Sequence, residues 1–143
     1  MKKGTQNYPL IAIFIFIFSL AFPLLLLPIE KTLPYPYILE EVAKAILILL
    51  ALRISSKNFQ IKLAIFIAFL FAFSENFFYL SVFAQNESLP IFFQRFIITS
   101  LLHILTALII LLPSQKNSRL FFPAILIAML FHFLYNHAIL SFL

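Results

Sequence analysis

The chain has 143 residues, of which 64% are hydrophobic and 10% charged, and its formal net charge is +5. A water-soluble domain of this length leaves too much surface exposed to hide so many apolar side chains. The composition therefore excludes a soluble globular domain and predicts an integral membrane protein. The absence of cysteine excludes disulfides and thiolate metal sites. The positive charge does not predict nucleic-acid binding, because the basic residues stand where membrane topology places them.

Five apolar segments follow one another along the chain, each close to the ~20 residues that a helix needs to cross a bilayer. They cover about 9–28, 36–54, 62–84, 90–112 and 120–142. The polar links between them are short, and none is long enough to form a domain. We therefore predict an all-α bundle of five transmembrane helices that forms a single membrane domain over residues 1–143.

Lysine and arginine alternate between the two sides of this predicted bundle. The basic regions are the N-terminal tail, the second link with its border and the fourth link, with Lys2, Lys3, Arg53, Lys57, Lys62, Lys116 and Arg119. The third link and the C-terminus have no basic residue, and the first link has Lys31 beside Glu30. The positive-inside rule then predicts that the N-terminus lies in the cytoplasm and the C-terminus outside. We expect the protein to lie in the cytoplasmic membrane.

Four of the apolar segments carry polar side chains that lipid cannot satisfy. In chain order these are Glu40, Glu41 and Lys44; Glu75 and Asn76; Arg95 and His103; and His132 and Asn136. Counted at ~1.5 Å per helical residue from the outer ends, they share one slab between the outer face and just past the midplane. The inner halves of the second, third and fifth segments have no polar side chain. We therefore expect the polar residues to face one another or a water-filled pocket.

Helical spacing supports such a cluster. Lys44 follows Glu40 by four residues and Glu41 by three, so either pair shares a helix face. We predict that four residues from four helices point into one pocket, namely Glu41, Glu75, His103 and His132. Lys44 or Arg95 would compensate the excess negative charge.

Carboxylates, imidazoles and an amide in one pocket suit hydrolysis. A carboxylate can take a proton from water, and a histidine and an asparagine can donate hydrogen bonds to a developing oxyanion. Alternatively, a divalent metal such as zinc can be held with one position open for water; the candidate ligands are Glu41, Glu75, His103 and His132. A zincin site is excluded because no HExxH motif is present. We favour a glutamate-activated water without an obligatory metal, with zinc as the alternative.

A series of polar motifs follows in order along the chain. It consists of "EEVAK" with Glu40, Glu41 and Lys44, "FAFSEN" with Phe71, Glu75 and Asn76, then His103, and finally "HFLYN" with His132 and Asn136. This series resembles the PrsW family of intramembrane proteases, and through it the CAAX-prenyl endopeptidase and bacteriocin-immunity superfamily. The resemblance implies a membrane-embedded endopeptidase in which Glu40 or Glu41 activates water. It also implies that His132 and Asn136 stabilise the oxyanion or bind a metal.

These considerations define a candidate site and its partners. The predicted catalytic residues are Glu40, Glu41, Glu75, His103, His132 and Asn136, supported by Lys44, Asn76 and Arg95. The expected partners are a membrane-anchored protein or peptide substrate and the lipid bilayer, without nucleic acid. The alternative is a non-catalytic membrane immunity or binding protein that uses the same pocket. A carrier is disfavoured because inverted repeats and glycine-broken helices are absent.

Overall fold

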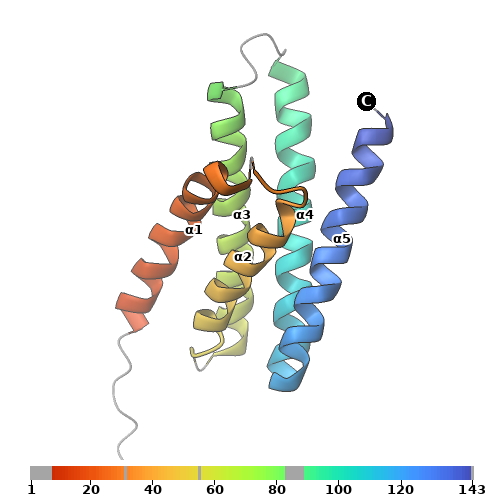
Figure 1. The fold of residues 1–143 in the computed structure, drawn as a ribbon. Helices are drawn as coiled ribbons and strands as arrows, with labels where there is room; N and C mark the ends of the chain where they lie inside the picture. The colour runs from red at the N-terminus through yellow and green to blue at the C-terminus, as the bar shows by residue number, and fades with distance from the viewer. Residues whose placement is uncertain (1–7, 31, 55, 83–88, 143) are drawn as a thin grey trace, which may run out of the picture.

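The computed structural model describes residues 8–30, 32–54, 56–82 and 89–142, all of them in helices or short connections (Figure 1). The helices are α1 (Tyr8–Glu30), α2 (Tyr37–Ala51), α3 (Lys57–Val82), α4 (Leu89–Lys116) and α5 (Phe121–Phe142), and a short 3-10 helix η1 (Ser118–Leu120) leads into α5. The all-α prediction is confirmed. Parts of the predicted second and fourth links are helical, because α3 begins at Lys57 and α4 continues to Lys116.

Four of the five helices are long and apolar enough to cross a membrane. The candidate spans are Pro9–Glu30, Lys57–Phe78, Leu89–Lys116 and Ser118–Ala138. The exception is α2, whose 15 residues extend only about 22 Å, against the ~30 Å of a hydrocarbon core. The orientation of the termini stays a prediction, and Lys2, Lys3 and Lys31, which contribute to it, lie outside the described residues.

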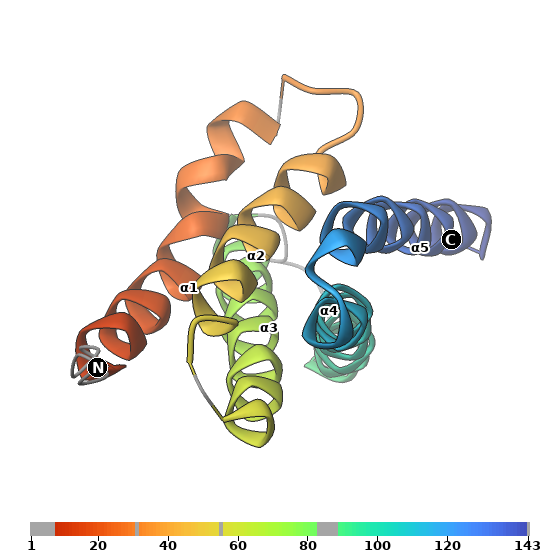
Figure 2. The same ribbon diagram turned by 90° about the horizontal axis from the view of Figure 1, so that it is seen from below.

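The helix α2 is the centre of the bundle. It contacts all four other long helices, and the view from below shows it among them (Figure 2). One face of α2 is buried, with Glu41, Lys44 and Ile48, whereas Val42 and Leu49 on the other face are exposed. This division follows the 3.6-residue period of the helix. The helix that is too short to span is thus the one that contacts all the other long helices.

Two buried apolar clusters hold the helices together. One contains Ile48 of α2, Ala68 of α3, Ile110 of α4 and Ala128 of α5, and the other joins α1 to α2 and α3. Small alanines let helix backbones approach closely, which is how helices associate in lipid. Because α1 packs against α2 and α3 in the second cluster, the packing fits the prediction of one domain over residues 1–143, which stays a prediction.

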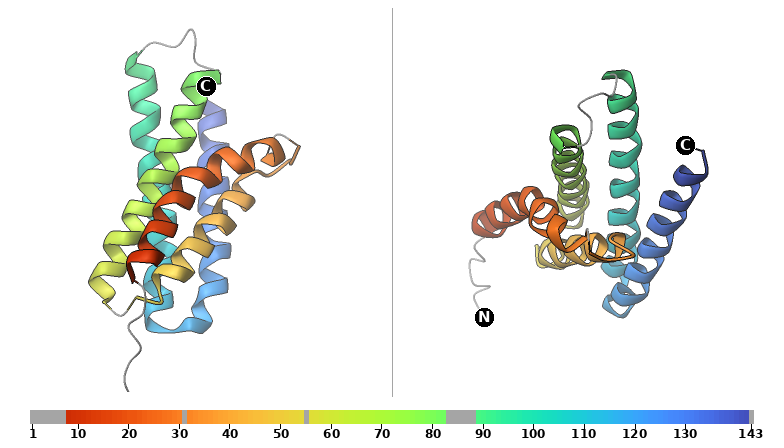
Figure 3. Two further views of the ribbon diagram at one scale, coloured as in Figure 1. Left: turned by 90° about the vertical axis from the view of Figure 1, so that its left-hand side faces the viewer. Right: turned by 45° about the horizontal axis from the view of Figure 1, so that its top comes forward.

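The connection from α1 to α2 lies well below the ends at which α3 leads into α4 (Figures 1 and 3). The first turn of α2 is therefore brought to the level of the middle of α4 and α5. His103 lies halfway along α4, and His132 lies halfway along α5. The polar residues at the start of α2 accordingly lie deeper than counting from the end of a spanning helix predicts.

Candidate functional site

A chain of buried polar contacts joins α2 to α4 and α5. The Glu41 Oε1 atom accepts a hydrogen bond from Lys44 Nζ at 2.7 Å and lies 2.8 Å from His132 Nδ1. Lys44 Nζ also donates to Thr106 Oγ1 at 2.7 Å. The side chains of Glu41 and Lys44 are fully buried. Buried charges persist where they are paired and hydrogen-bonded, so these residues stabilise one another's position.

A second pair stands beside this chain. His103 Nε2 of α4 lies 2.8 Å from Glu75 Oε2 of α3. The two histidine rings meet edge to face, with centroids 5.5 Å apart. On the other side of His132, its Nε2 atom lies 3.5 Å from Glu40 Oε2. Three carboxylates and two imidazoles from four helices therefore form one cluster.

Part of this cluster has the arrangement of a metal site. Glu40, Glu75 and His103 each offer one ligand atom, and the three atoms lie within 4.8 Å of one another. Oxygen and nitrogen donors of this kind suit a divalent ion such as zinc. Within the described part of the chain, the buried Glu40 Oε2 atom has no hydrogen-bond partner. The donor set and this oxygen, which accepts no hydrogen bond among the described residues, both fit a cation.

This set differs in two members from the ligands predicted from the sequence. Glu75 and His103 belong to both sets, but Glu40 takes the place of Glu41, whose Oε1 is already shared by Lys44 and His132. His132 borders the set through its Nε2 atom, which faces Glu40. The predicted gathering of Glu41, Glu75, His103 and His132 between the helices agrees with these contacts.

The remaining predicted residues lie around the cluster. Arg95 is part-buried on α4 and acts electrostatically on Glu75. Asn136 is part-buried one turn beyond His132, and among the described residues no hydrogen bond joins it to the cluster. Asn76 points elsewhere, because its Nδ2 donates to the Ala72 carbonyl at 2.8 Å and the residue lines a separate pocket.

Two residues near the cluster were missed in the sequence. Thr106 is fully buried and receives the hydrogen bond of Lys44; its position three residues after His103, on the same helix face, was the signal that could have found it. Glu30, at the end of α1, is part-buried and acts electrostatically on Glu40 and Glu75. It was assigned to a link because its helix was expected to end earlier.

Fold and site together define an integral membrane protein whose helices enclose a Glu/His cluster able to hold a metal ion. A family model described as PrsW family intramembrane metalloprotease matches residues 32–143, and the chain belongs to this family. The match covers α2 to α5 and begins after α1. Searches of the curated proteins and of the solved structures gave no match.

Family membership supports an intramembrane protease function, with membrane-anchored substrates in the lipid bilayer. It also fits the metal alternative, since the family is described as one of metalloproteases, and it gives no support to the prediction of a metal-free enzyme. The wider likeness to the CAAX-prenyl endopeptidase and bacteriocin-immunity superfamily is not supported.

Proposed function

We propose that this protein hydrolyses peptide bonds of membrane-anchored proteins of the cytoplasmic membrane at the Glu/His cluster. The observation that carries the proposal is the convergence of Glu40, Glu75 and His103 from three helices, with His132 held beside Glu40. The cluster lies at the middle of α4 and α5, and with the predicted topology it is reached from the outer half of the bilayer.

Glu40, Glu75 and His103 are the residues that would hold a divalent ion, with zinc as the first choice for their oxygen and nitrogen donors. When bound, such an ion supplies Lewis-acid chemistry, polarising the scissile carbonyl and making water a stronger acid. Glu75 is the most accessible of these three side chains at 31% exposure, against 13% for Glu40 and 0% for His103. This exposure supports an approach of water and substrate to the cluster past Glu75.

His132 is suited to move a proton. Its Nδ1 atom is hydrogen-bonded to Glu41, whereas its Nε2 atom faces Glu40 at the edge of the cluster. A carboxylate on one ring nitrogen fixes the tautomer and the orientation of the ring, leaving the other nitrogen as the acceptor. We assign to Nε2 the proton of the attacking water and its delivery to the leaving amine.

Glu41 acts on His132 in this scheme and does not touch the water. Lys44 and His132 share its Oε1 atom, so this oxygen is already engaged by two partners. Lys44 balances the charge of Glu41, and Thr106 holds Lys44 in place. Asn136, one turn beyond His132, and Arg95, which acts on Glu75, are the proposed donors to the oxyanion.

The test is proteolysis by purified protein in lipid nanodiscs, with a library of single-span peptides as substrate. We expect cleavage within the membrane segment, abolished in Glu40→Gln and His132→Ala. His137→Ala is the matched control, because His137 is exposed on the same helix and stacks on Phe133. If wild-type protein binds the peptides without cutting any, the chain is the non-catalytic binding protein that the sequence left as the alternative.

A further inference from the structure

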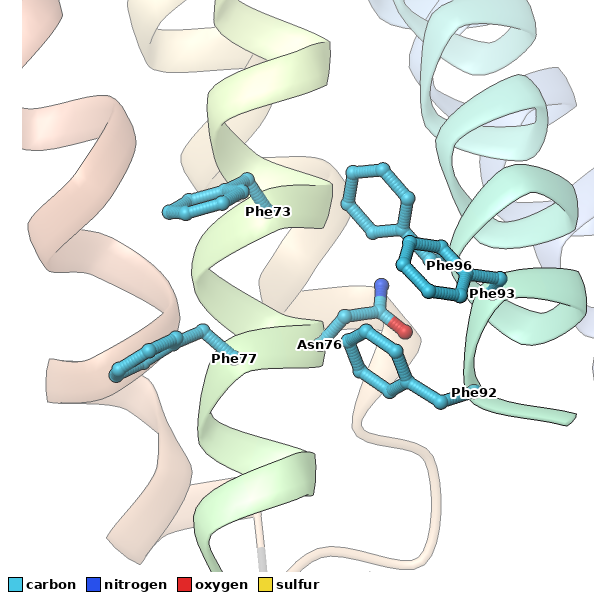
Figure 4. Close-up of a pocket in the computed structure, with 6 residues that line it drawn as sticks. All are labelled: Phe73, Asn76, Phe77, Phe92, Phe93 and Phe96. Atoms are coloured by element: carbon cyan, nitrogen blue, oxygen red, sulfur yellow. The ribbon is translucent and has the colours of Figure 1, made fainter. Parts of the chain in front are cut away.

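A pocket separate from the Glu/His cluster lies between α3 and α4. It has a volume of about 150 Å³, and its walls are five phenylalanines and one asparagine, namely Phe73, Phe77, Phe92, Phe93, Phe96 and Asn76 (Figure 4). We call the five phenylalanines the Phe collar. Asn76 directly follows Glu75 in the chain, but consecutive residues of a helix point about 100° apart. Glu75 therefore lies in the Glu/His cluster, whereas Asn76 lines the separate pocket.

The rings of the Phe collar form a continuous series around the pocket. Along α3, the centroids of Phe73 and Phe77 are 6.2 Å apart, and Phe73 meets Phe96 of α4 edge to face at 6.4 Å. The series continues to Phe92 at 6.4 Å and from there to Phe93 at 5.7 Å. Phe73, Phe77 and Phe93 are 46%, 62% and 56% exposed, so the pocket opens toward the membrane.

The pocket contains one hydrogen-bond acceptor that lacks a donor. Asn76 is 1% exposed, and its Oδ1 atom is buried without a partner among the residues that the structure describes. Figure 4 shows the Asn76 amide between the rings of Phe92, Phe93 and Phe96. The amide orientation is fixed, because Nδ2 donates to the Ala72 carbonyl and a flip would bring two oxygens together. An acceptor in apolar surroundings is unfavourable until a donor arrives.

The size, chemistry and level of the pocket together describe its ligand. A pocket of about 150 Å³ that opens toward the membrane has room for about one benzene-sized ring, and phenylalanine walls favour an aromatic ring packed edge to face. The pocket lies one to three turns from the end of α3 and within the first two turns of α4, and the predicted topology places this part of the bundle toward the outer surface of the bilayer. Tyrosine and tryptophan are enriched at this level of transmembrane helices, and each carries an aromatic ring with one donor.

We propose that the Phe collar binds a tyrosine or tryptophan side chain from the transmembrane helix of a partner membrane protein, whose O–H or N–H donates to Asn76 Oδ1. A lipid acyl chain fills the same volume but leaves the oxygen without a donor. The inference does not depend on the proposed proteolytic function, because none of the six lining residues belongs to the Glu/His cluster.

The test uses two synthetic polyleucine helices in nanodiscs, one with tyrosine near each end and one with phenylalanine at the same positions. Each carries a photoreactive diazirine beside the aromatic residue, and crosslinking to the protein is quantified. We expect the tyrosine peptide to label wild-type protein about three- to tenfold more than the phenylalanine peptide, the effect of one net hydrogen bond. In Asn76→Leu, which removes the acceptor at similar size, the two peptides should label equally.

Phe93→Ala supplies a second variant that preserves the fold, because the Phe93 ring is 56% exposed. It should reduce labelling by both peptides, whereas Phe122→Ala, which removes a 75% exposed ring on α5, should leave labelling unchanged. Equal labelling of wild-type protein by both peptides would show apolar contact alone and overturn the proposal. A tyrosine preference that persists in Asn76→Leu would overturn it equally.

Discussion

Two layers of the same bundle both contain fully buried side chains but differ in chemistry. In the layer of the Glu/His cluster, Glu41, Lys44 and His103 are fully buried. One to two turns along the same helices, Ile48, Ala68 and Ile110 are just as buried and form a purely apolar cluster. Burial therefore does not by itself mark function in this protein.

The difference lies in what each layer requires of its partners. The apolar layer needs complementary shape. There, replacing one hydrophobic residue by another of similar volume costs little stability. The polar layer needs every charge to find a partner, because an unpaired charge in a bilayer is expensive. We therefore expect the charges of the polar layer to serve chemistry, and the following substitutions test this distinction.

The largest effect is expected at His132. His132→Ala removes the proposed proton carrier, and general acid–base catalysis contributes about 10²- to 10⁴-fold. We expect peptide cleavage to fall by at least 10²-fold while the folded fraction, measured by circular dichroism in nanodiscs, stays high. A loss of less than about tenfold would remove His132 from the proton-transfer role.

Glu41→Gln should have a large effect on stability, in addition to any effect on activity through His132. It leaves the buried Lys44 ammonium without its counter-charge, and breaking a buried pair from one side costs about 3–5 kcal/mol. Unfolding by denaturant titration in mixed micelles measures the change. Lys62→Gln, at an exposed position on α3, is the control and should change stability by less than about 0.5 kcal/mol. An equally small effect of Glu41→Gln would mean that Lys44 is not paired as described.

Ile48→Ala probes the apolar layer. Removing a fully buried isoleucine side chain should cost about 2–5 kcal/mol of unfolding free energy. Cleavage per folded molecule should nevertheless stay within about twofold of the wild type, since Ile48 packs among apolar residues of the other layer. If activity per folded molecule falls by more than tenfold, the two layers are coupled and the comparison between them fails.

Within the polar layer, the smallest effect is expected at Thr106, where two variants distinguish a positioning role from a packing role. Thr106→Val keeps the shape but removes the acceptor of Lys44 Nζ. A hydrogen bond to a charged group contributes about 1.5–3 kcal/mol, so we expect activity to fall by about 10- to 100-fold. Thr106→Ser restores the hydroxyl and should recover most of it. Steady-state cleavage across pH 5–9 is the measurement, because a positioning role shifts the pH profile and a packing role does not. Equal activities of the valine and serine variants would contradict a positioning role of the Thr106 hydroxyl.

The helices and the candidate residues were predictable from the sequence, but their exact partners were not. Apolar segments and alternating basic links mark the helices, and the polar interruptions of these segments mark the cluster. The choice between Glu40 and Glu41 depends on the rotation of α2, since adjacent helical residues point about 100° apart. The depth of α2 depends on where its connection to α1 lies (Figure 3). Both properties arise from packing between helices, which a local pattern does not encode.

Asn76 illustrates the same limit. In the sequence it adjoins Glu75 and was grouped with the site, whereas in the structure its amide lies among the rings of the Phe collar (Figure 4). Thr106 shows the opposite case. Its place three residues after His103 puts it on the face of the site, but its hydrogen bond with Lys44 depends on how α2 and α4 pack together.

The most direct test of the account is the metal content of the protein, measured together with cleavage on the same sample. Wild-type protein should bind about one zinc ion per chain, lose cleavage after exhaustive chelation and regain it with one equivalent of zinc. Glu75→Gln should lower zinc affinity by at least tenfold, whereas Lys62→Gln should retain both zinc and activity. Full cleavage by protein shown to be free of divalent metal would contradict the assignment of Glu40, Glu75 and His103 as ligands and restore the glutamate-activated water as the mechanism.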